Sequence, residues 1–265
     1  MPYETLILET ADSPSDGAVR VLYLNRPKVL NAMNTRMFLE LRDALRVLRE
    51  DARTRCVVVT GSGSRAFSAG GDLKERNGMD EDTWRRQHEL IEEALLGVKD
   101  FPLPIIAAVE GYAHGGGCEL ALMCDFIVAS ESAQFSLPEA TRGIMPGGGG
   151  IQNLARAMGM RRAKQYLFTG GTFDATQAHA YGMVNEITPI GGALDAALAV
   201  AARIVAAAPM SVRYLKLAVS RGAEVDFHTG YALDIAAYNI LVSSQDRHEG
   251  VAAFNEKRAP HWKNR

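Results

Sequence analysis

The sequence contains no segment that would carry the protein into or across a membrane. Its apolar runs stay below the ~20 residues that a membrane-spanning helix requires, and the run over residues 193–209 is interrupted by Asp195 and Arg203. The opening stretch, MPYETLILETADSPSD, shows neither a basic start followed by an apolar run nor an Arg-rich amphipathic pattern. Because signal and transit peptides have those features, we expect a cytoplasmic protein without membrane contact.

Cysteine and net charge are both scarce. The cysteines, Cys56, Cys118 and Cys124, show neither C-x-x-C spacing nor the Cys/His spacing of zinc ligands. They predict buried core thiols, and they support neither disulfides nor a structural metal. The formal net charge is only -2 at pH 7, so the chain as a whole has no field that would attract nucleic acid. The chain has 265 residues, of which 47% are hydrophobic and 23% are charged. This length and composition are typical of a globular enzyme that acts on small molecules.

Short apolar runs alternate with helical patterns in the first part of the chain. The helical pattern is clearest after Asn34, a candidate N-cap, where apolar residues recur every three or four positions and charged residues occupy the other face. Strands that are covered by helices on both faces have unbroken apolar runs. The runs that predict such strands are 19–24, 56–60, 105–110 and 126–130. The alternation predicts an α/β fold.

The last third of the chain is predicted to be mainly helical. From Gly159 onward, strand signals are nearly confined to residues 183–188. The predicted helices are 193–207, 211–220 and 224–242. We therefore expect an α/β body over residues 1–190 and a helical C-terminal region over residues 191–265.

One glycine motif resembles a nucleotide-binding fingerprint. Gly61-Ser-Gly63-Ser-Arg-Ala66 follows a predicted strand and matches G-x-G-x-x-A. That fingerprint must lead directly into a helix whose N-terminus binds the pyrophosphate, but here two further glycines, Gly70 and Gly71, stand where the helix should be. We reject the dinucleotide interpretation. The P-loop, serine-hydrolase elbow and zinc-protease motifs do not occur in the sequence either.

Three glycine-bearing segments remain, at residues 66–74, 111–119 and 137–150. Taken alone, each is explained by a tight turn or a close backbone approach. Glu119 falls in the first turn of a helix predicted to begin near Cys118, and Glu139 follows Pro138. A carboxylate at a helix N-terminus is stabilised by the helix dipole whatever its function, so neither glutamate alone indicates a catalytic site.

The combination is more specific than its parts. FSAGGDLK, GGGCELA and QFSLPE, in this order and spacing, resemble the enoyl-CoA hydratase/isomerase (crotonase) family, and the resemblance extends from NRPKVLNA at residues 25–32 to DRHEG at 246–250 and AFNEKR at 253–258. It implies a crotonase-like spiral of ββα units over residues 1–190, which would hold the active site. It also implies that residues 191–265 form trimer contacts, in a homotrimer or a dimer of trimers.

The resemblance also implies a reaction and a set of catalytic residues. The amides of Gly71 and Gly116 would donate to the thioester oxygen as it gains negative charge. Glu119 would orient and deprotonate a water, and Glu139 would deliver a proton to C2 of the substrate. The implied reaction is the reversible hydration of a 2-enoyl-CoA to a 3-hydroxyacyl-CoA. Coenzyme A is then part of the substrate, and no separate cofactor is implied.

Further residues are implied to bind the substrate. In the family, the pantetheine and adenine lie along residues 66–74 and contact its backbone, and the amide of Gly147 would help to hold the water. Side chains near the entrance and in the C-terminal region would meet the nucleotide and its phosphates. The residues implied in binding are Ala69, Gly71, Asp72, Leu73, Lys74, Gly116, Gly147, Lys28, Phe254 and Lys257.

Several alternatives stay open at the level of sequence. His114 replaces an aliphatic residue of the family pattern, and it either contacts a polar or carboxylated acyl group or packs as an ordinary loop histidine. The segments GGDLKER, MPGGGG and GAEVD look closest to the methylglutaconyl-CoA hydratase branch, which has been linked to RNA binding. The helix over 36–55 interleaves basic with acidic residues, which disfavours a nucleic-acid surface. An isomerase would usually keep only one of the two glutamates.

Overall fold

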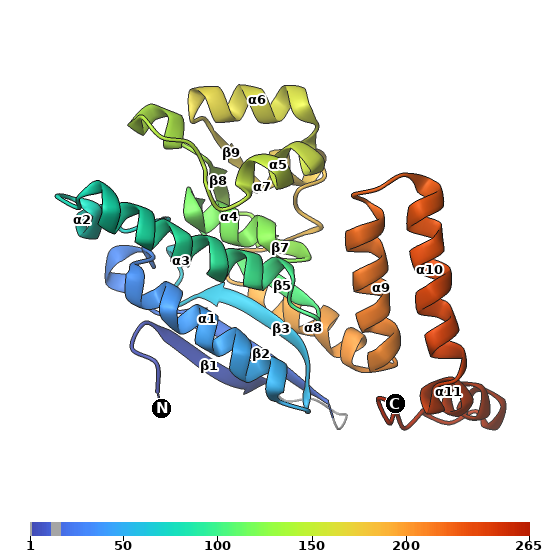
Figure 1. Cartoon of the computed structure of the whole chain (residues 1–265). Coiled ribbons are helices and arrows are strands. Elements are labelled where there is room, and N and C mark those ends of the chain that lie inside the picture. Colours follow the sequence, from blue (N-terminus) through green and yellow to red (C-terminus); the bar gives the residue numbers. More distant parts are fainter. Residues whose placement is uncertain (1, 12–16) are drawn as a thin grey trace.

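The computed structural model describes residues 2–11 and 17–265 and shows an α/β body with two sheets (Figure 1). The larger sheet has the strand order β1-β2-β3-β5-β7-β10. β1 pairs antiparallel with β2, and all the other pairs in this sheet are parallel. The strands are β1 Leu6–Ala11, β2 Ala18–Leu24, β3 Thr54–Gly61, β5 Ile105–Val109, β7 Phe126–Ser130 and β10 Glu186–Thr188. The four strands predicted from apolar runs are confirmed.

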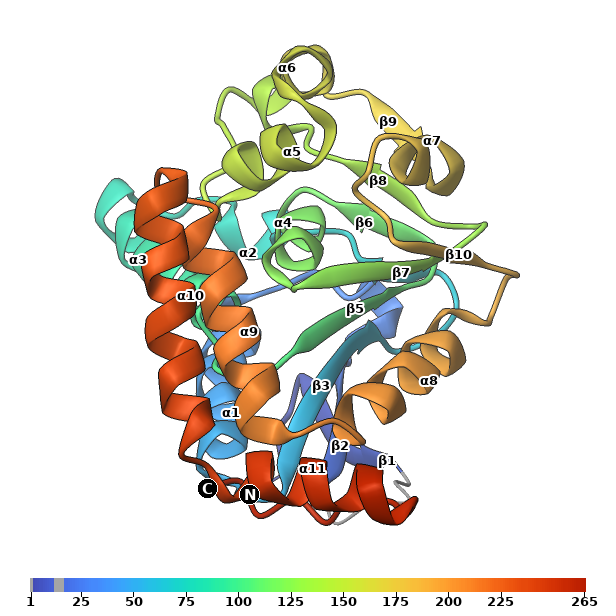
Figure 2. The same cartoon turned by 90° about the vertical axis from the view of Figure 1, so that its right-hand side faces the viewer.

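Both faces of the larger sheet are buried, as its apolar strands require. On β3, Val57 and Val59 pack into the core beneath α1 (Thr35–Glu50) and α3 (Glu81–Lys99). The alternate residues Cys56 and Val58 pack on the opposite face, against the alanine-rich side of α8 (Ala193–Val205). This period-two division is the geometry of a strand between two helical layers. Figure 2 shows α8 and α1 on opposite sides of the sheet.

The smaller sheet accounts for the expected spiral of ββα units. Its order is β4-β6-β8-β9, with β4, β6 and β8 parallel and β9 antiparallel to β8. The consecutive pairs β3–β4, β5–β6 and β7–β8 therefore place one strand in each sheet, and a helical segment follows each of these pairs, which confirms the expected ββα units. The strands are β4 Ala66–Ser68, β6 Tyr112–His114, β8 Gln134–Ser136 and β9 Thr172–Asp174. β9 lies in a region where no strand was predicted, because three residues leave almost no periodic signal.

Local sequence signals explain several element boundaries. The Asn34 side chain accepts a hydrogen bond from the Met37 amide at 3.0 Å, so the predicted N-cap of α1 is confirmed. The segment after Gly63 forms strand β4 and no helix, which agrees with rejecting the dinucleotide fingerprint. The expected start of α4 near Cys118 is wrong by two residues, because Gly116 already opens the helix. All three cysteines are buried and free, as predicted.

The remaining helices connect the strands and form the C-terminal region. The helix α11 lies outside the predicted helices, because its apolar and polar residues show no clear face. The short 3-10 helices are η1 Pro27–Val29 and η2 Glu139–Arg142. The other helices are α2 Leu73–Arg76, α4 Gly116–Met123, α5 Gly150–Met158, α6 Met160–Thr169, α7 Ala175–Ala180, α9 Pro209–Gly222, α10 Phe227–Val242 and α11 Gln245–Glu256.

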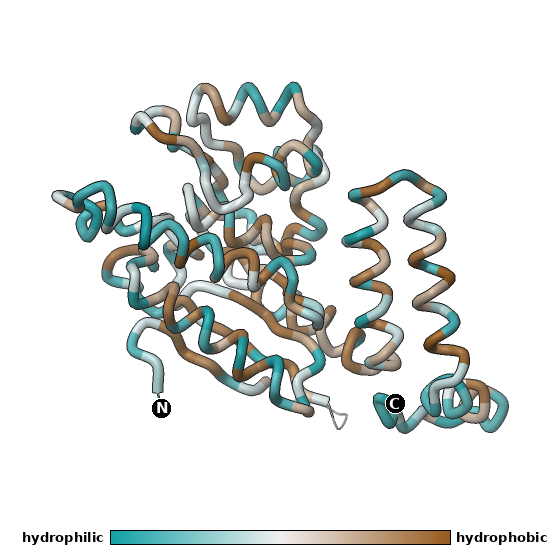
Figure 3. The backbone as a smooth tube through the Cα atoms, in the orientation of Figure 1, coloured by the Kyte–Doolittle hydropathy of each residue, from teal (hydrophilic) through white to brown (hydrophobic). Residues whose placement is uncertain are grey.

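The C-terminal helices α9 and α10 form an antiparallel pair that stands beside the body (Figure 1). They carry exposed apolar side chains, among them Leu215, Val219, Tyr231 and Tyr238, and Figure 3 shows apolar stretches along both helices. α8, by contrast, packs on the sheet. The division at residue 190 stays a prediction, but the part of the chain that stands off the body begins at α9.

No single helix in residues 2–11 and 17–265 is long and apolar enough to cross a membrane. α8 and α9 meet that test only when they are taken together, and the two helices are bent by 111° at their junction.

Replacing Asn34 with alanine is expected to lower the free energy of unfolding by about 1 kcal/mol, because the first turn of α1 loses its side-chain acceptor. Urea denaturation of the two proteins measures this difference. Asn34→Asp keeps the acceptor and serves as the matched control. An alanine variant as stable as the aspartate variant would contradict the assignment of the cap.

Candidate active site

The three glycine-bearing segments meet because they follow neighbouring parallel strands. β4, β6 and β8 are adjacent in the smaller sheet, so their carboxyl ends lie at one edge. The chain leaves β4 into residues 69–72, leaves β6 into Gly115 and α4, and leaves β8 into Glu139. Binding sites in α/β folds commonly form at this end of the strands. Residues that are 20 to 70 positions apart in the sequence are thereby brought to one place.

Two of the glycines are required by close backbone packing. Gly70 has φ +92°, and a Cβ at this position would lie 2.6 Å from the carbonyl oxygen of His114. A Cβ on Gly117 would collide with the carbonyl oxygen of Ser68. Side chains at either position would push the first loop away from the start of α4, so glycine is needed here for contact between the two segments.

This contact places the amides of Gly71 and Gly116 side by side. A Cβ on Gly116 would lie 3.6 Å from the Gly71 nitrogen. In the bridge between Met33 and Gly71, the hydrogen bonds use the Gly70 carbonyl and the Asp72 amide, so the Gly71 N–H points to the other side. Gly116 is the first residue of α4, where a helix leaves its N–H groups without internal acceptors. The geometry therefore offers two donors, with the positive end of the α4 dipole behind one of them.

Glu119 is buried in the first turn of α4 and is only 5% exposed. Its Oε1 accepts hydrogen bonds from the amides of Gly148 at 2.7 Å and Gly150 at 3.0 Å. Burial raises the pKa of Glu119, and the two amide donors, with the nearby His88 and Arg76, act in the opposite direction. The carboxylate is thus fixed in one orientation, with Oε2 left for another partner.

Glu139 opens the 3-10 helix η2 and lies close to Gly115, since a Cβ on that glycine would be 3.0 Å from its Oε1. In the described part of the chain, its buried Oε2 has no hydrogen-bond partner. Burial, followed by the nearby negative charge of Glu119, raises the pKa of Glu139 to about 7. The two carboxyl groups therefore differ, because one is held by amides and the other keeps a proton up to neutral pH.

Arg76, at the end of α2, was missed as a site residue. Its guanidinium carbon lies 3.6 Å from where a Cβ on Gly71 would be. Burial lowers the pKa of Arg76, and the nearby charges of Glu75, Glu119 and Glu139 act in the opposite direction. A basic residue soon after the first glycine segment was visible in the sequence. Its orientation toward the glutamates depends on the fold.

The backbone of the first loop is only partly free for a ligand. The amide of Ala69 donates to the Leu30 carbonyl and the amide of Asp72 donates to the Met33 carbonyl, both at 2.9 Å. The Asp72 side chain caps α2 and pairs with Arg26 at 2.8 Å. Leu73 and Lys74 are exposed on α2. The coenzyme A contacts that the resemblance implies for these residues remain predictions. Because the amides of Ala69 and Asp72 already donate to protein carbonyls, only the carbonyl groups of these two residues are left for a ligand.

Gly147 and His114 flank the glutamates. A Cβ on Gly147 would collide with the His88 ring, and the contacts to Glu119 come from Gly148 and Gly150. The role of the Gly147 amide therefore stays a prediction, and the two later glycines were missed because the sequence does not distinguish members of a glycine run. His114 is half-buried with its ring 5.1 Å from that of Tyr112. Burial lowers the pKa of His114, which favours its neutral form.

The more distant residues implied in nucleotide binding do not converge in one chain. Lys28 is exposed on η1, next to the loop that holds Ala69. Phe254, 83% exposed, and Lys257 belong to α11 and its C-cap. Figures 1 and 2 both show α11 far from α2. The contribution of α11 to the site of a neighbouring subunit stays a prediction.

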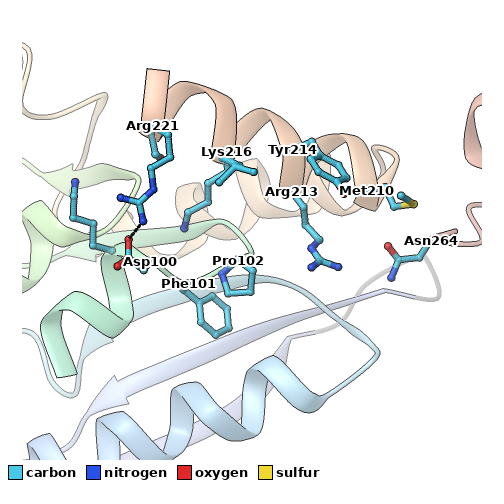
Figure 4. A pocket seen from close by; sticks show the side chains of 12 residues that line it. Asp100, Phe101, Pro102, Met210, Arg213, Tyr214, Lys216, Arg221 and Asn264 are labelled. Carbon is cyan, nitrogen blue, oxygen red and sulfur yellow. Dashed lines mark hydrogen bonds and ion pairs between the residues drawn. The ribbon is translucent and has the colours of Figure 1, made fainter. Parts of the chain in front are cut away.

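A separate cavity lies where α9 meets the body (Figure 4). Its walls are α9 and the segment that follows α3, and neither Glu119 nor Glu139 lines it. Arg221 pairs with Asp100 at 3.0 Å, and Lys216 pairs with Asp125 at 2.8 Å. These ion pairs join α9 to the body, so the cavity belongs to the junction of the C-terminal region.

Known proteins share both the sequence and the fold. The enoyl-CoA hydratase/isomerase family matches residues 15–265. The crotonyl-CoA hydratase of Syntrophomonas wolfei is 36% identical over 258 residues, which is 97% of this chain and 97% of that protein. The 2,3-dehydroadipyl-CoA hydratase of Escherichia coli is 38% identical over 247 residues, or 93% of this chain and 96% of that protein.

Among solved structures, an enoyl-CoA hydratase from Bacillus anthracis matches with a TM-score of 0.93 and 40% identity, over 97% of this chain and 99% of that chain. The paired glutamates beside two free amides thus lie in a crotonase fold. The chain belongs to the enoyl-CoA hydratase/isomerase family, which confirms the resemblance seen in its sequence.

The raised pKa of Glu139 predicts a pH effect on stability. The folded protein binds this proton more tightly than the unfolded chain, so the free energy of unfolding falls as the pH rises from 4.5, the ordinary pKa, to about 7. Glu139→Gln removes this dependence. Over that pH range, the free energy of unfolding of the variant should rise by about 1–2 kcal/mol relative to that of the natural protein. This value is reduced because Glu139 is partly exposed to solvent. Urea denaturation at several pH values measures it, and a constant difference would contradict the raised pKa.

Proposed function

We propose that the protein hydrates a 2-enoyl-CoA thioester to a 3-hydroxyacyl-CoA. The observation that carries this proposal is the pair of carboxyl groups, Glu119 and Glu139, next to two adjacent backbone amides. The names of several relatives, crotonyl-CoA hydratase and 2,3-dehydroadipyl-CoA hydratase among them, support this reaction class.

The amides of Gly71 and Gly116 would bind the thioester oxygen. As water adds to C3, negative charge moves through the double bond to this oxygen, and donors fixed in advance stabilise it without reorganisation. Backbone N–H groups suit this role because both glycines allow the substrate to come close. Loss of one such donor typically costs about 3 kcal/mol of barrier.

The two carboxyl groups would handle the water and its protons. Glu119, oriented by the Gly148 and Gly150 amides, accepts a proton from water as the oxygen bonds to C3. Glu139 holds a proton because its pKa is raised, and it gives that proton to C2. One carboxyl group gains a proton and the other loses one, so exchange of a proton with solvent restores the starting state. The reverse reaction uses the same groups with their roles exchanged.

The competing functions receive less support. An isomerase on this fold would need only one acid, and here both are present and close enough for the charge of Glu119 to raise the pKa of Glu139. RNA binding along α1 would need free basic side chains. Arg42 pairs with Glu93 at 2.7 Å, and Arg46 pairs with Asp43 at 2.8 Å. These ion pairs leave α1 as a mixed surface and not a track for phosphates.

The assembly and the location of the protein are also proposals. The exposed apolar side chains of α9 and α10, such as Leu215 and Tyr238, suit a contact between subunits of a trimer or of a dimer of trimers. In such an assembly, a neighbouring subunit would bring Phe254 and Lys257 of α11 to the nucleotide. We propose a cytoplasmic enzyme, and mitochondrial relatives exist in mammals.

Purified protein should consume crotonyl-CoA without an added cofactor, with loss of the conjugated thioester absorbance. Glu139→Gln should lower kcat by about 100-fold or more, because the amide carries no proton that can be given to C2, while the binding of crotonyl-CoA should change little. Glu131→Gln, an exposed glutamate beyond β7, is the control and should keep full activity. Wild-type turnover in Glu139→Gln would contradict the acid role. Inactivity of the natural protein toward a panel of 2-enoyl-CoA thioesters would overturn the hydratase proposal.

A further inference from the structure

Arg76 is a half-buried cation beside the candidate active site. No ion pair to Arg76 is present among residues 2–11 and 17–265, although Glu75 precedes it in the chain. Burial lowers the pKa of Arg76, and the nearby charges of Glu75, Glu119 and Glu139 act in the opposite direction. An arginine stays protonated at neutral pH in spite of such a shift. Because this half-buried cation makes no direct ion pair with these acids, a ligand that brings a negative charge into contact with it would stabilise it further.

The guanidinium is held in a defined orientation. Its Nε donates to Gln87 Oε1 at 2.8 Å, and its plane lies over the Trp84 ring with Cζ 4.5 Å from the ring centroid. Gln87 is itself fixed, because its amide nitrogen donates to Thr35 and Glu75. These contacts use one edge of the group, and the two terminal nitrogens have no protein acceptor in the described part of the chain. The two terminal nitrogens are not among the fully buried side-chain atoms that lack a hydrogen-bond partner. Both are therefore open to a ligand.

The position of Arg76 relative to the reacting groups suggests which part of the substrate it meets. Its Nη1 lies 3.7 Å from where a Cβ on Gly71 would be, and both Glu119 and Glu139 influence its charge. An acyl group with its thioester oxygen at Gly71 and its double bond between the glutamates must therefore pass close to the guanidinium. An alkyl chain would leave this cation unpaired, whereas a carboxylate would match its planar pair of donors.

We propose that Arg76 binds a carboxylate at the far end of the acyl group, so that the preferred substrates are 2-enoyl-CoA thioesters of dicarboxylic acids. The inference rests on the proposed hydratase function and names its substrate class. The fork of two N–H donors, oriented by Gln87 and Trp84, would bind the two carboxylate oxygens together. Arg76 is then a residue that determines specificity, and the glutamates carry out the same chemistry on any enoyl thioester.

The test compares two substrates of the same shape. Glutaconyl-CoA ends in a carboxylate, and 5-methylhex-2-enoyl-CoA replaces the two carboxylate oxygens with methyl groups. The natural protein should show a higher kcat/KM for glutaconyl-CoA. In Arg76→Met this kcat/KM should fall by about 10- to 100-fold, the value of a charged hydrogen-bonded pair, while that for 5-methylhex-2-enoyl-CoA should change less than about threefold.

Controls separate the guanidinium from a general loss of charge. Arg86→Met removes an exposed arginine of the neighbouring helix α3 and should leave both values unchanged. Arg76→Lys keeps the charge without the fork, and it should recover only part of the preference. If the Arg76 variants do not fold, calorimetry on the natural protein still decides the matter, because it should bind the unreactive glutaryl-CoA at least about tenfold more tightly than 5-methylhexanoyl-CoA.

The outcomes distinguish this inference from the function on which it rests. An equal loss on both substrates in Arg76→Met would overturn the proposal and assign Arg76 to positioning of the glutamates. A natural protein that hydrates both thioesters equally well, or binds both saturated analogues equally, would also overturn it and leave the hydratase function intact. Hydration of neither thioester, with no binding of either analogue, would overturn both proposals.

Discussion

The buried carboxylate of Glu119 is the interaction on which the rest of the site depends. A lone carboxyl group at this depth would hold its proton, because burial favours the neutral form. The amides of Gly148 and Gly150 oppose this tendency and hold one oxygen. The same contact brings the glycine loop before α5 onto α4. Burial and the nearby charge of Glu119 raise the pKa of Glu139. The amide hydrogen bonds thus orient Glu119 and make the two carboxyl groups unequal.

The parallel strands β4, β6 and β8 supply the second constraint. Because they are adjacent, the ends of three distant segments must meet at one sheet edge. The missing side chains of Gly70 and Gly117 then let two of these segments touch. The active site needs no long loop under this arrangement. Its parts are a strand end, a helix start, a single turn of 3-10 helix and the short helix α2, which carries Arg76.

The apolar strands, the capped helix α1 and the three glycine segments were all predictable from the sequence, because each depends on local periodicity or on a short run of characteristic residues. The role of Glu119 and Glu139 was implied by resemblance alone, since either could have been a helix-end carboxylate. Three features could not be predicted from the sequence: the hydrogen bonds from the Gly148 and Gly150 amides to Glu119, the packing of α8 on the sheet, and the approach of Arg76 to the glutamates. Each depends on contacts between segments far apart in the chain, which periodicity does not record.

We propose that Glu119 and Glu139 act on one water as a unit. A double-mutant cycle tests this most directly, with kcat for crotonyl-CoA hydration measured in Glu119→Gln, Glu139→Gln and the double variant. If the two groups work together in one step, removing the second after the first should cost much less than removing it from the natural protein. Losses that multiply in the double variant would mean that the glutamates act independently, and would contradict this account.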